Sequence, residues 1–398
     1  MIDWLTRHDP DRVFLETPSG SRTYGEILDS VHNRPVAGVE LLRPGFAAAS
    51  VVDILAVMSR GTAVLAGPDV EVPVGIEQDG AAVVVFTSGT TGTTKGVRLT
   101  RENWEAAVKA SQQHLGNDRK DVWLLAMALH RVGGIAIVLR SVFAGGTVRM
   151  LSRFDPVEFA AALRSGVTFA SVVPTMLQRI LDINPGPYRG VRAVLVGGGP
   201  IPDRLLERAS EAGLPVLPSY GMSETCGQIA TLRPGSAVER KVHPLPGVEL
   251  RIEPDKRIAV RGPMVSSGYL GEPDREPGSW FVTGDLGELD SGGALRVLGR
   301  ADNVIVSGGE NIDPELIETS LMAIAGVEAV LVVGVPSEEW GMEVACLYVG
   351  DLEPAVVESR LRKRLGGSLI PKRWLRVKVL PTTDLGKPDR SEAIRLLS

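Results

Sequence analysis

Short apolar runs alternate with amphipathic segments through most of the chain. The apolar runs are rich in Val, Leu and Ile, which is typical of buried strands, whereas apolar residues at every third or fourth position favour helices. This alternation predicts the parallel layers of an α/β fold. The expected strands are 83–86, 122–126, 147–151, 169–173, 191–196 and 216–218, and the expected helices are 101–114, 156–164, 176–181 and 203–212.

The pattern changes twice in the second half of the chain. Short strands joined by turn-rich loops indicate a small β subdomain, with strands at 248–252, 258–261 and 294–298. A compact α+β region follows, with helices at 314–323 and 353–365 and strands at 327–333 and 344–349. We therefore predict an α/β protein in two parts. A large N-terminal domain of layered α/β with a small β subdomain spans 1–300, and a small mobile α+β C-terminal domain spans 301–398.

Composition narrows the class of protein. The chain has 398 residues, of which 44% are hydrophobic and 23% charged, as in ordinary globular enzymes. A net charge of −5 gives no support for nucleic-acid binding, and no apolar run reaches the length of a membrane span. The charged N-terminus does not read as a signal peptide, and Cys226 and Cys346 lack the spacing of metal ligands. We expect a cytoplasmic protein.

The segment 87–96 carries the strongest chemical signal. It follows an apolar run and holds three glycines, six hydroxyl side chains and one lysine. Glycine allows backbone N–H groups to face an anion, and hydroxyls and a lysine add donors and positive charge, so the segment predicts a polyphosphate cradle. It is not a Walker A loop, because Thr94 precedes Lys95 and Gly96 follows it. The expected phosphate contacts are Thr87, Ser88, Gly89, Thr90, Thr91, Gly92 and Lys95.

This loop resembles the phosphate loop of the adenylate-forming superfamily, which includes acyl- and aryl-CoA synthetases, peptide-synthetase adenylation domains and luciferases. Thr94 stands where that family usually has proline. Further segments resemble the superfamily's motifs and occur in the same order, at 197–200, 219–224, 283–285, 299–302 and 385–388. The resemblance covers the chain from about residue 80 to its end.

The resemblance implies a two-step reaction that uses ATP, Mg²⁺ and coenzyme A. In the first step a carboxylate attacks the α-phosphorus of ATP and pyrophosphate leaves. Glu224 would ligate Mg²⁺, although a Glu at this place can also cap a short helix, and the Ser223 hydroxyl would donate to the α-phosphate. The nucleoside would bind to Gly197, Gly198, Gly199, Pro200, Ser219, Tyr220 and Gly221 at its adenine, and to Asp285 and Arg300 at its ribose.

The second step would need the C-terminal domain to move. By resemblance, Lys387 bridges the substrate carboxylate and the α-phosphate during adenylation, and Asp302 is the hinge. After the swing, Gly308 and Gly309 would let the pantetheine arm of coenzyme A pass close to the backbone. His130 matches a segment near the acyl and thiol tunnel, as a lining residue or as an ordinary core histidine.

Three segments resemble o-succinylbenzoate–CoA ligases of menaquinone biosynthesis, at 219–229, 130–142 and 304–312. An acid with two carboxylates needs a cation for the carboxylate that does not react, and Arg131 or Arg140 could supply it. Gly221, Met222 and Gly227 could form the slot for its ring. The alternatives are a CoA ligase for another aryl or fatty acid, an adenylating enzyme that loads a carrier protein, and a non-catalytic nucleotide- or acyl-binding protein. A homodimer is also compatible with the sequence.

Overall fold

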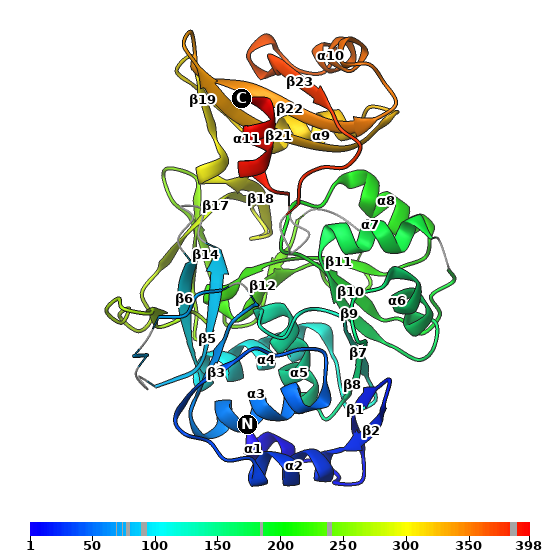
Figure 1. Ribbon diagram of the computed structural model, residues 1–398, viewed down its shortest axis with the longest axis vertical. Helices are drawn as coiled ribbons and strands as arrows, with labels where there is room; N and C mark the ends of the chain where they lie inside the picture. The colour runs from blue at the N-terminus through cyan, green and yellow to red at the C-terminus, as the bar shows by residue number, and fades with distance from the viewer. Residues whose placement is uncertain are drawn as a thin grey trace.

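The computed structural model describes residues 1–398 except 69, 74, 77–79, 89–93, 184–185, 237–240 and 383–387. Figure 1 shows a large part that carries the N-terminus and a smaller part, from β19 onward, that carries the C-terminus. Two sheets of the large part enclose helices α3, α4 and α5, while α6, α7 and α8 cover the outer face of one of these sheets (Figure 1). The predicted α/β class is therefore confirmed.

The largest sheet has nine strands in the order β13-β12-β11-β10-β9-β7-β8-β1-β2. The strands from β11 to β1 in this order run parallel, as the alternation of strands and helices predicted. Two of them, β9 and β10, are buried at every position, which explains why their sequences are mostly apolar. The bounds are β1 Val13–Thr17, β2 Gly20–Thr23, β7 Val122–Leu125, β8 Thr147–Met150, β9 Phe169–Val172, β10 Ala193–Val196, β11 Val216–Met222, β12 Gly227–Thr231 and β13 His243–Pro244.

The second sheet of the large part has the order β16-β6-β5-β4-β3. Its strands are β3 Val39–Leu42, β4 Thr62–Leu65, β5 Ala81–Ser88, β6 Thr94–Thr100 and β16 Gly268–Tyr269. The predicted β subdomain is a four-stranded antiparallel sheet of β14 Glu249–Ile252, β15 Arg257–Arg261, β17 Phe281–Leu289 and β18 Leu295–Arg300. The sequence pattern missed β17, because its polar and glycine residues break the apolar alternation.

The helices of the large part are α1 Ile2–Leu5, α2 Tyr24–Asn33, α3 Ala48–Arg60, α4 Arg101–Leu115, α5 Val132–Ala144, α6 Pro156–Leu163, α7 Pro174–Asp182 and α8 Asp203–Glu211. Helix α4 begins where Thr100 and Asn103 form a reciprocal cap, and Gly116 in the left-handed region ends it. Trp4, Trp104 and Trp123 are fully buried in the core between the sheets. None of the helices in the described ranges combines the length and apolarity of a membrane span.

The C-terminal part has one five-stranded sheet, of β19 Ile305–Ser307, β20 Glu310–Ile312, β21 Val327–Ser337, β22 Gly341–Gly350 and β23 Arg373–Arg376. Helices α9 Pro314–Met322, α10 Pro354–Arg362 and α11 Arg390–Leu397 complete it. Short 3₁₀ turns lie at η1 Ser223–Thr225, in the large part, at η2 Ala301–Asn303, just before β19, and at η3 Gly367–Leu369. Two hydrophobic clusters drawn from 305–397 form its own core. The boundary between 300 and 301 remains a prediction.

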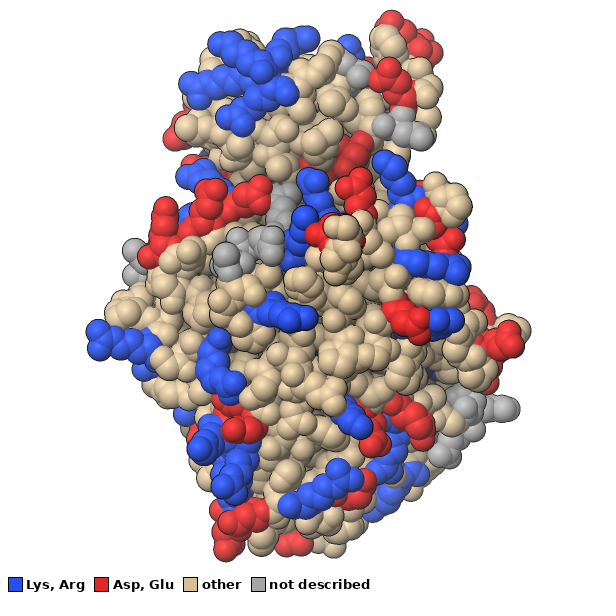
Figure 2. Space-filling view, turned by 180° about the vertical axis from the view of Figure 1, so that it is seen from behind, with Lys and Arg blue, Asp and Glu red and all other residues tan. Residues whose placement is uncertain are grey.

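Figure 2 shows Lys and Arg side chains gathered on one face of the C-terminal part. Exposed basic residues cluster at the end of α10, where Arg360, Arg362, Lys363 and Arg364 lie close together in sequence. This local basic face could not be inferred from the net charge of the chain, which is negative. Part of its charge is compensated, because Arg362 pairs with Glu358 on the same helix at 2.8 Å.

A partly buried carboxyl group, that of Glu315, lies where the two parts meet. The Glu315 side chain on α9 lies against Gly299 on β18, so closely that a Cβ at position 299 would stand 2.9 Å from the Glu315 carboxyl carbon. Burial, followed by repulsion from Glu318, raises the pKa of Glu315 to about 8. The other charged groups around it are Asp313, Arg390 and Asp285.

Glu315→Gln should make stability less dependent on pH. Folded Glu315 titrates near pH 8, against 4.5 for an ordinary glutamate, so the folded protein holds an extra proton and loses stability as pH rises across this window. At pH 8.5 the variant should therefore be more stable than wild type, by at most about 5 kcal/mol because each of the roughly 3.5 pKa units corresponds to about 1.4 kcal/mol, and the difference should vanish below about pH 5. Urea denaturation from pH 5 to 8.5 measures this. Glu328→Gln, at an exposed position of β21, is the matched control.

Candidate functional site

The two arms of the predicted phosphate loop are paired strands. Thr87 pairs with Lys95 and Ser88 pairs with Thr94, so β5 and β6 form an antiparallel hairpin. Lys95 therefore lies on a strand, which corrects the expectation that it belongs to the loop itself. The predicted contacts Gly89, Thr90, Thr91 and Gly92 lie outside the described residues, as does Lys387.

Two further predicted segments meet at the carboxyl ends of β10 and β11. A Cβ at Gly197 would stand 2.7 Å from the carbonyl oxygen of Ser219, so these two backbones touch. Gly198 has φ +80°, a left-handed conformation that glycine adopts without strain. Gly199 and Pro200 complete the turn before α8. The carboxyl ends of parallel strands are where open α/β sheets bind ligands.

The hairpin of β11 and β12 needs a glycine at position 221. A Cβ at Gly221 would collide with the carbonyl oxygen of Gly227 on the facing strand. The pairing also shifts register between Tyr220 and Gly221, which turns the chain toward η1. Met222 pairs with Gly227 in this hairpin, so the three residues expected to form a ring slot are adjacent.

One hydrogen-bonded network joins three of the sequence motifs. The Tyr220 hydroxyl donates to Asp285 at 2.8 Å, and Arg300 donates to the other oxygen of Asp285 at 3.2 Å. Arg300 also donates two hydrogen bonds to Asp302, at 3.0 and 2.8 Å. Residues 220, 285, 300 and 302 are thus brought together, and the hinge candidate Asp302 is tied to the expected ribose contacts.

Burial and hydrogen bonds keep Tyr220 and Arg300 protonated in this network. Burial, more than the nearby Asp285 carboxylate, raises the pKa of Tyr220 above its usual range, so its hydroxyl remains a donor. The hydrogen bonds to Asp302 are the main cause that raises the pKa of Arg300. The network therefore holds the Asp285 carboxylate in place on β17, where its oxygens can accept hydrogen bonds from a diol.

Glu224 lies on η1, directly after the hairpin strand that carries Tyr220. Its Oε1 accepts a hydrogen bond from the Tyr269 hydroxyl at 2.9 Å, and its neighbour Ser223 opens the same 3₁₀ turn. Tyr269 also lies beneath Lys95, whose Nζ is 4.8 Å from the centre of the ring. The sequence reasoning did not single out Tyr269, because its segment Ser267-Gly268-Tyr269-Leu270 carries no charge.

A buried polar chain that the sequence reasoning also missed runs beneath the hairpin. Arg140 on α5 donates to Gln228 on β12 at 3.0 Å, and the Ser111 hydroxyl donates to the same oxygen at 2.8 Å. Gln228 in turn donates to Thr231, whose hydroxyl donates to Ser219 at 3.0 Å. The buried amide of Gln228 thus connects the core helices with the expected adenine segment.

Arg140 is a buried cation without a carboxylate partner among the described residues. Burial lowers its pKa to about 10, so the guanidinium stays charged at neutral pH. Arg131 is half-buried and donates to the carbonyl oxygen of Phe86, at the end of β5, at 2.9 Å. Both arginines that sequence left as alternatives are therefore held near the site's strands, and Arg140 is the more deeply buried.

His130 lies directly before Arg131, ahead of α5. Its Nε2 would stand 3.3 Å from a Cβ at Gly67, so it faces the end of β4. Burial, and then the Arg131 cation, lower the pKa of His130, which favours the neutral ring at neutral pH. A neutral histidine in this place is consistent with a lining role.

Gly308 and Gly309 lie apart from this cluster, in the turn between β19 and β20. Their φ angles are +56° and +85°, and the Gly308 N–H donates to the Trp340 carbonyl oxygen at 3.0 Å. A Cβ at Gly308 would stand 2.8 Å from the Trp340 ring. These glycines therefore shape a surface of the C-terminal part.

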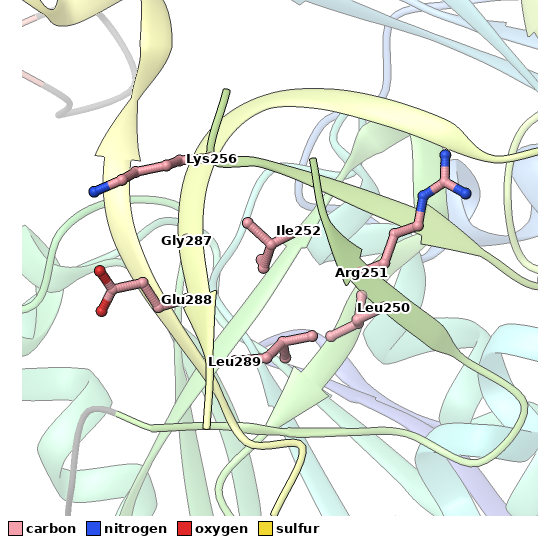
Figure 3. Close-up of a pocket in the computed structure, with 7 residues that line it drawn as sticks. All are labelled: Leu250, Arg251, Ile252, Lys256, Gly287, Glu288 and Leu289. Atoms are coloured by element: carbon pink, nitrogen blue, oxygen red, sulfur yellow. The ribbon is translucent and has the colours of Figure 1, made fainter. Parts of the chain in front are cut away.

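A separate cavity of about 490 Å³ lies on the β subdomain (Figure 3). None of the candidate site residues lines it, so it is not the site described above. Its lining consists of Leu250, Arg251, Ile252, Lys256, Gly287, Glu288 and Leu289. No group of three or more potential metal ligands occurs among the residues that the structure describes.

Gly221→Ala should disrupt the hairpin of β11 and β12, because the new methyl group collides with the Gly227 carbonyl. We expect a loss of about 3 kcal/mol of stability in urea denaturation, together with weaker ATP binding in equilibrium dialysis. Gly45→Ala is the control, since a Cβ there meets no atom within 4 Å. Equal stability of the two variants would contradict the close approach of these strands.

Two family models match the chain. The AMP-binding enzyme model matches residues 8–270, and the model of the AMP-binding enzyme C-terminal domain matches residues 316–387. The first match covers most of the large part and the second lies within the smaller part.

Curated and solved relatives agree with this assignment. A 2-succinylbenzoate–CoA ligase of Listeria monocytogenes is 39% identical over 345 residues, which cover 83% of this chain and 74% of the relative. The o-succinylbenzoate CoA synthetase of Bacillus subtilis in complex with its acyl-adenylate intermediate has a TM-score of 0.84 and 28% identity, covering 98% of this chain and 97% of the other. The same synthetase in complex with ATP and a magnesium ion has a TM-score of 0.83 and 27% identity, covering 98% of each chain. The chain therefore belongs to the AMP-binding enzyme family, the adenylate-forming enzymes.

Proposed function

We propose that this chain is an AMP-forming o-succinylbenzoate–CoA ligase. Its curated relatives with that activity match most of its length, and the observation that carries the proposal is the cluster around β11 and η1. There Tyr220, Asp285 and Arg300 form one network, and Glu224 lies a few residues beyond Tyr220. The reaction joins the acid to coenzyme A in two steps and belongs to menaquinone biosynthesis in the cytoplasm. A homodimer stays a prediction.

The first step brings two anions together, a carboxylate and the triphosphate of ATP. The site must therefore supply donors and positive charge where the α-phosphorus is attacked. Asp285 accepts hydrogen bonds from the ribose hydroxyls, while Arg300 holds that carboxylate in place. The adenine lies against the touching backbones at Gly197 and Ser219, beside the Tyr220 ring.

The triphosphate extends from there to the β5–β6 hairpin, where Lys95 provides positive charge. Ser223 donates its hydroxyl to the α-phosphate. Lys387 approaches from the C-terminal domain and holds the reacting carboxylate against the α-phosphorus, so that attack releases pyrophosphate. This lysine lies outside the described residues, and its role follows from the family motif.

Glu224 fits a magnesium site shared with the nucleotide. Mg²⁺ is commonly held by one or two carboxylates together with substrate phosphates and water. Glu224 offers one such carboxylate, and among the described residues its Oε2 has no hydrogen-bond partner. When bound, the ion neutralises phosphate charge and orients the leaving pyrophosphate.

The second step needs a different face of the C-terminal domain. Rotation about Asp302 removes Lys387 and brings the turn at Gly308 and Gly309 to the acyl-adenylate. The thiol of coenzyme A then attacks the acyl carbon and AMP leaves, with both electrons of the broken acyl–phosphate bond. Left-handed glycines at this turn leave room for the pantetheine arm, which His130 would line from the other side.

Arg140 is our choice for the second carboxylate of o-succinylbenzoate. A buried guanidinium whose partner is a neutral amide lacks a counter-charge, which a substrate carboxylate would provide. Arg131 is instead tied to the Phe86 carbonyl next to the phosphate hairpin. The acid would then lie between α5 and the β11–β12 hairpin, with Gly221 and Gly227 beside its ring.

Pyrophosphate release with ATP, Mg²⁺ and a panel of acids, with and without coenzyme A, tests the proposed function. We expect turnover that requires coenzyme A and prefers o-succinylbenzoate over benzoates and fatty acids. Preference for another acid would identify a different CoA ligase. Adenylate formation that proceeds to a carrier protein but not to coenzyme A would favour a loading enzyme. Nucleotide binding without pyrophosphate release from any acid would favour a non-catalytic binding protein.

Arg140→Gln should raise KM for o-succinylbenzoate by at least about 30-fold, because the carboxylate that does not react loses a buried charge partner. An analogue without that carboxylate should be affected far less. Arg131→Gln is the matched control, and it should change KM for both acids by similar, smaller factors. Steady-state kinetics with both acids measures this difference. An equal effect of Arg140→Gln on the two acids would reject the assignment.

A further inference from the structure

A short segment ties the two halves of the phosphate site together. The segment 266–270, which we call the strap, lies between η1 and β6 and contains β16. The Ser266 N–H donates to the Glu224 carbonyl oxygen at 2.7 Å, and the Ser266 hydroxyl donates to the Arg98 carbonyl oxygen at 2.9 Å. The strap is therefore fixed to the turn that carries Glu224 and to the strand that carries Lys95.

Backbone pairing sets the position of Tyr269 on the strap. Tyr269 pairs with Val97 on β6, and the Leu270 N–H donates to the Gly96 carbonyl oxygen at 2.8 Å. The chain after the strap is anchored as well, because Arg98 forms a 2.7 Å ion pair with Asp274. Since β6 is the outgoing arm of the phosphate hairpin, Tyr269 keeps its place relative to that hairpin.

The hydroxyl and the ring of Tyr269 each contact a different charged residue. Its hydroxyl donates to Glu224 Oε1 at 2.9 Å, while Lys95 Nζ lies 4.8 Å from the centre of its ring. Among the described residues, the ion-pair partner of Lys95 is Glu272, at 3.8 Å. Phenylalanine could not orient Glu224, and an aliphatic residue could not attract Lys95.

We propose that Tyr269 is a positioning residue that orients the Glu224 carboxylate for Mg²⁺ and the Lys95 ammonium for the triphosphate. The inference rests on the proposed function and adds a residue to its phosphate site. The hydroxyl occupies Oε1 of Glu224 and so leaves Oε2 for the metal ion, while the ring holds Lys95 beside the same hairpin. Tyr269 itself contacts neither the metal ion nor the acid. It restricts the Glu224 and Lys95 side chains before the ligand arrives, so these side chains lose less conformational entropy on binding.

Binding of Mn²⁺·ATP to the full-length protein, followed by electron paramagnetic resonance of Mn²⁺, tests this without turnover. Tyr269→Phe should weaken Mn²⁺·ATP binding about tenfold, which corresponds to the weaker hydrogen bonds formed with charged groups. It should leave the binding of metal-free ATP unchanged. Tyr269→Leu should weaken metal-free ATP binding in addition, by a few-fold, because Lys95 loses the ring. In kinetics, KM for Mg²⁺·ATP should rise more than kcat falls.

Tyr188→Phe is the matched control. It removes the same hydroxyl from a tyrosine that is 5% exposed and whose hydroxyl has no hydrogen-bond partner among the described residues. This variant should bind Mn²⁺·ATP like wild type. Thermal denaturation of every variant separates a loss of fold from a loss of orientation.

A double-mutant cycle locates the effect. If Tyr269 acts through Glu224, Tyr269→Phe should change Mn²⁺·ATP binding in wild type but not in the Glu224→Gln background. Unchanged or tighter binding in Tyr269→Phe, or an equal loss in both backgrounds, would overturn the proposal. A wild-type protein that binds no Mn²⁺·ATP would instead refute the proposed function, so the two failures are distinguishable.

Discussion

The ionic network of Asp285 and Arg300 is the interaction on which the rest of the site depends. Asp285 on β17 and Arg300 at the end of β18 pair within the β subdomain, and the Tyr220 hydroxyl, which donates to Asp285, joins this subdomain to the nine-stranded sheet. Arg300 also binds Asp302, which lies on η2 just before β19. One guanidinium therefore connects Asp285, the expected ribose contact, to the segment about which the small domain would turn. Because Asp285 and Tyr220 are mostly buried, this connection is screened less by solvent than a surface ion pair.

Close backbone contact is the second constraint. The site is built where strands approach so closely that no side chain fits, at Gly197 against Ser219 and at Gly221 against Gly227. Such contacts keep the expected adenine surface flat and leave main-chain groups to form it. Buried side chains then stabilise these strands from below, through the chain of hydrogen bonds from Arg140 to Gln228 and on to Ser219.

Much of the fold could be predicted from the sequence, because buried parallel strands have unbroken apolar sequences. All of the expected strands and helices overlap observed ones, from β5 to α10. The strand β17 escaped notice because Thr283, Gly284 and Asp285 interrupt its apolar alternation. Lys95 was expected in a loop because glycine and threonine are common in turns, yet pairing with Thr87 extends β6 through it.

The candidate site was predicted less completely, for a physical reason. Motif residues such as Glu224 and Asp285 carry charge in a recognisable order, so sequence resemblance found them. Tyr269 and Gln228 contribute by contacts that exist only after distant strands pair, and nothing in their local sequence signals this. Likewise, sequence could not choose between Arg131 and Arg140, because burial decides which cation lacks a counter-charge.

The carboxylates of the site have partners, whereas the Arg140 cation has no counter-charge among the described residues. This difference suits a reaction that joins two anions. The carboxylates have partners before any substrate arrives, Asp285 with Tyr220 and Arg300, and Glu224 with Tyr269. These partners lower the repulsion that free carboxylates would exert on a triphosphate. Arg140, in contrast, has only neutral contacts among the described residues. Its desolvation is unfavourable in the free protein, and in the proposed function the second carboxylate of the acid would offset it, so that binding energy would be concentrated where the acid is held.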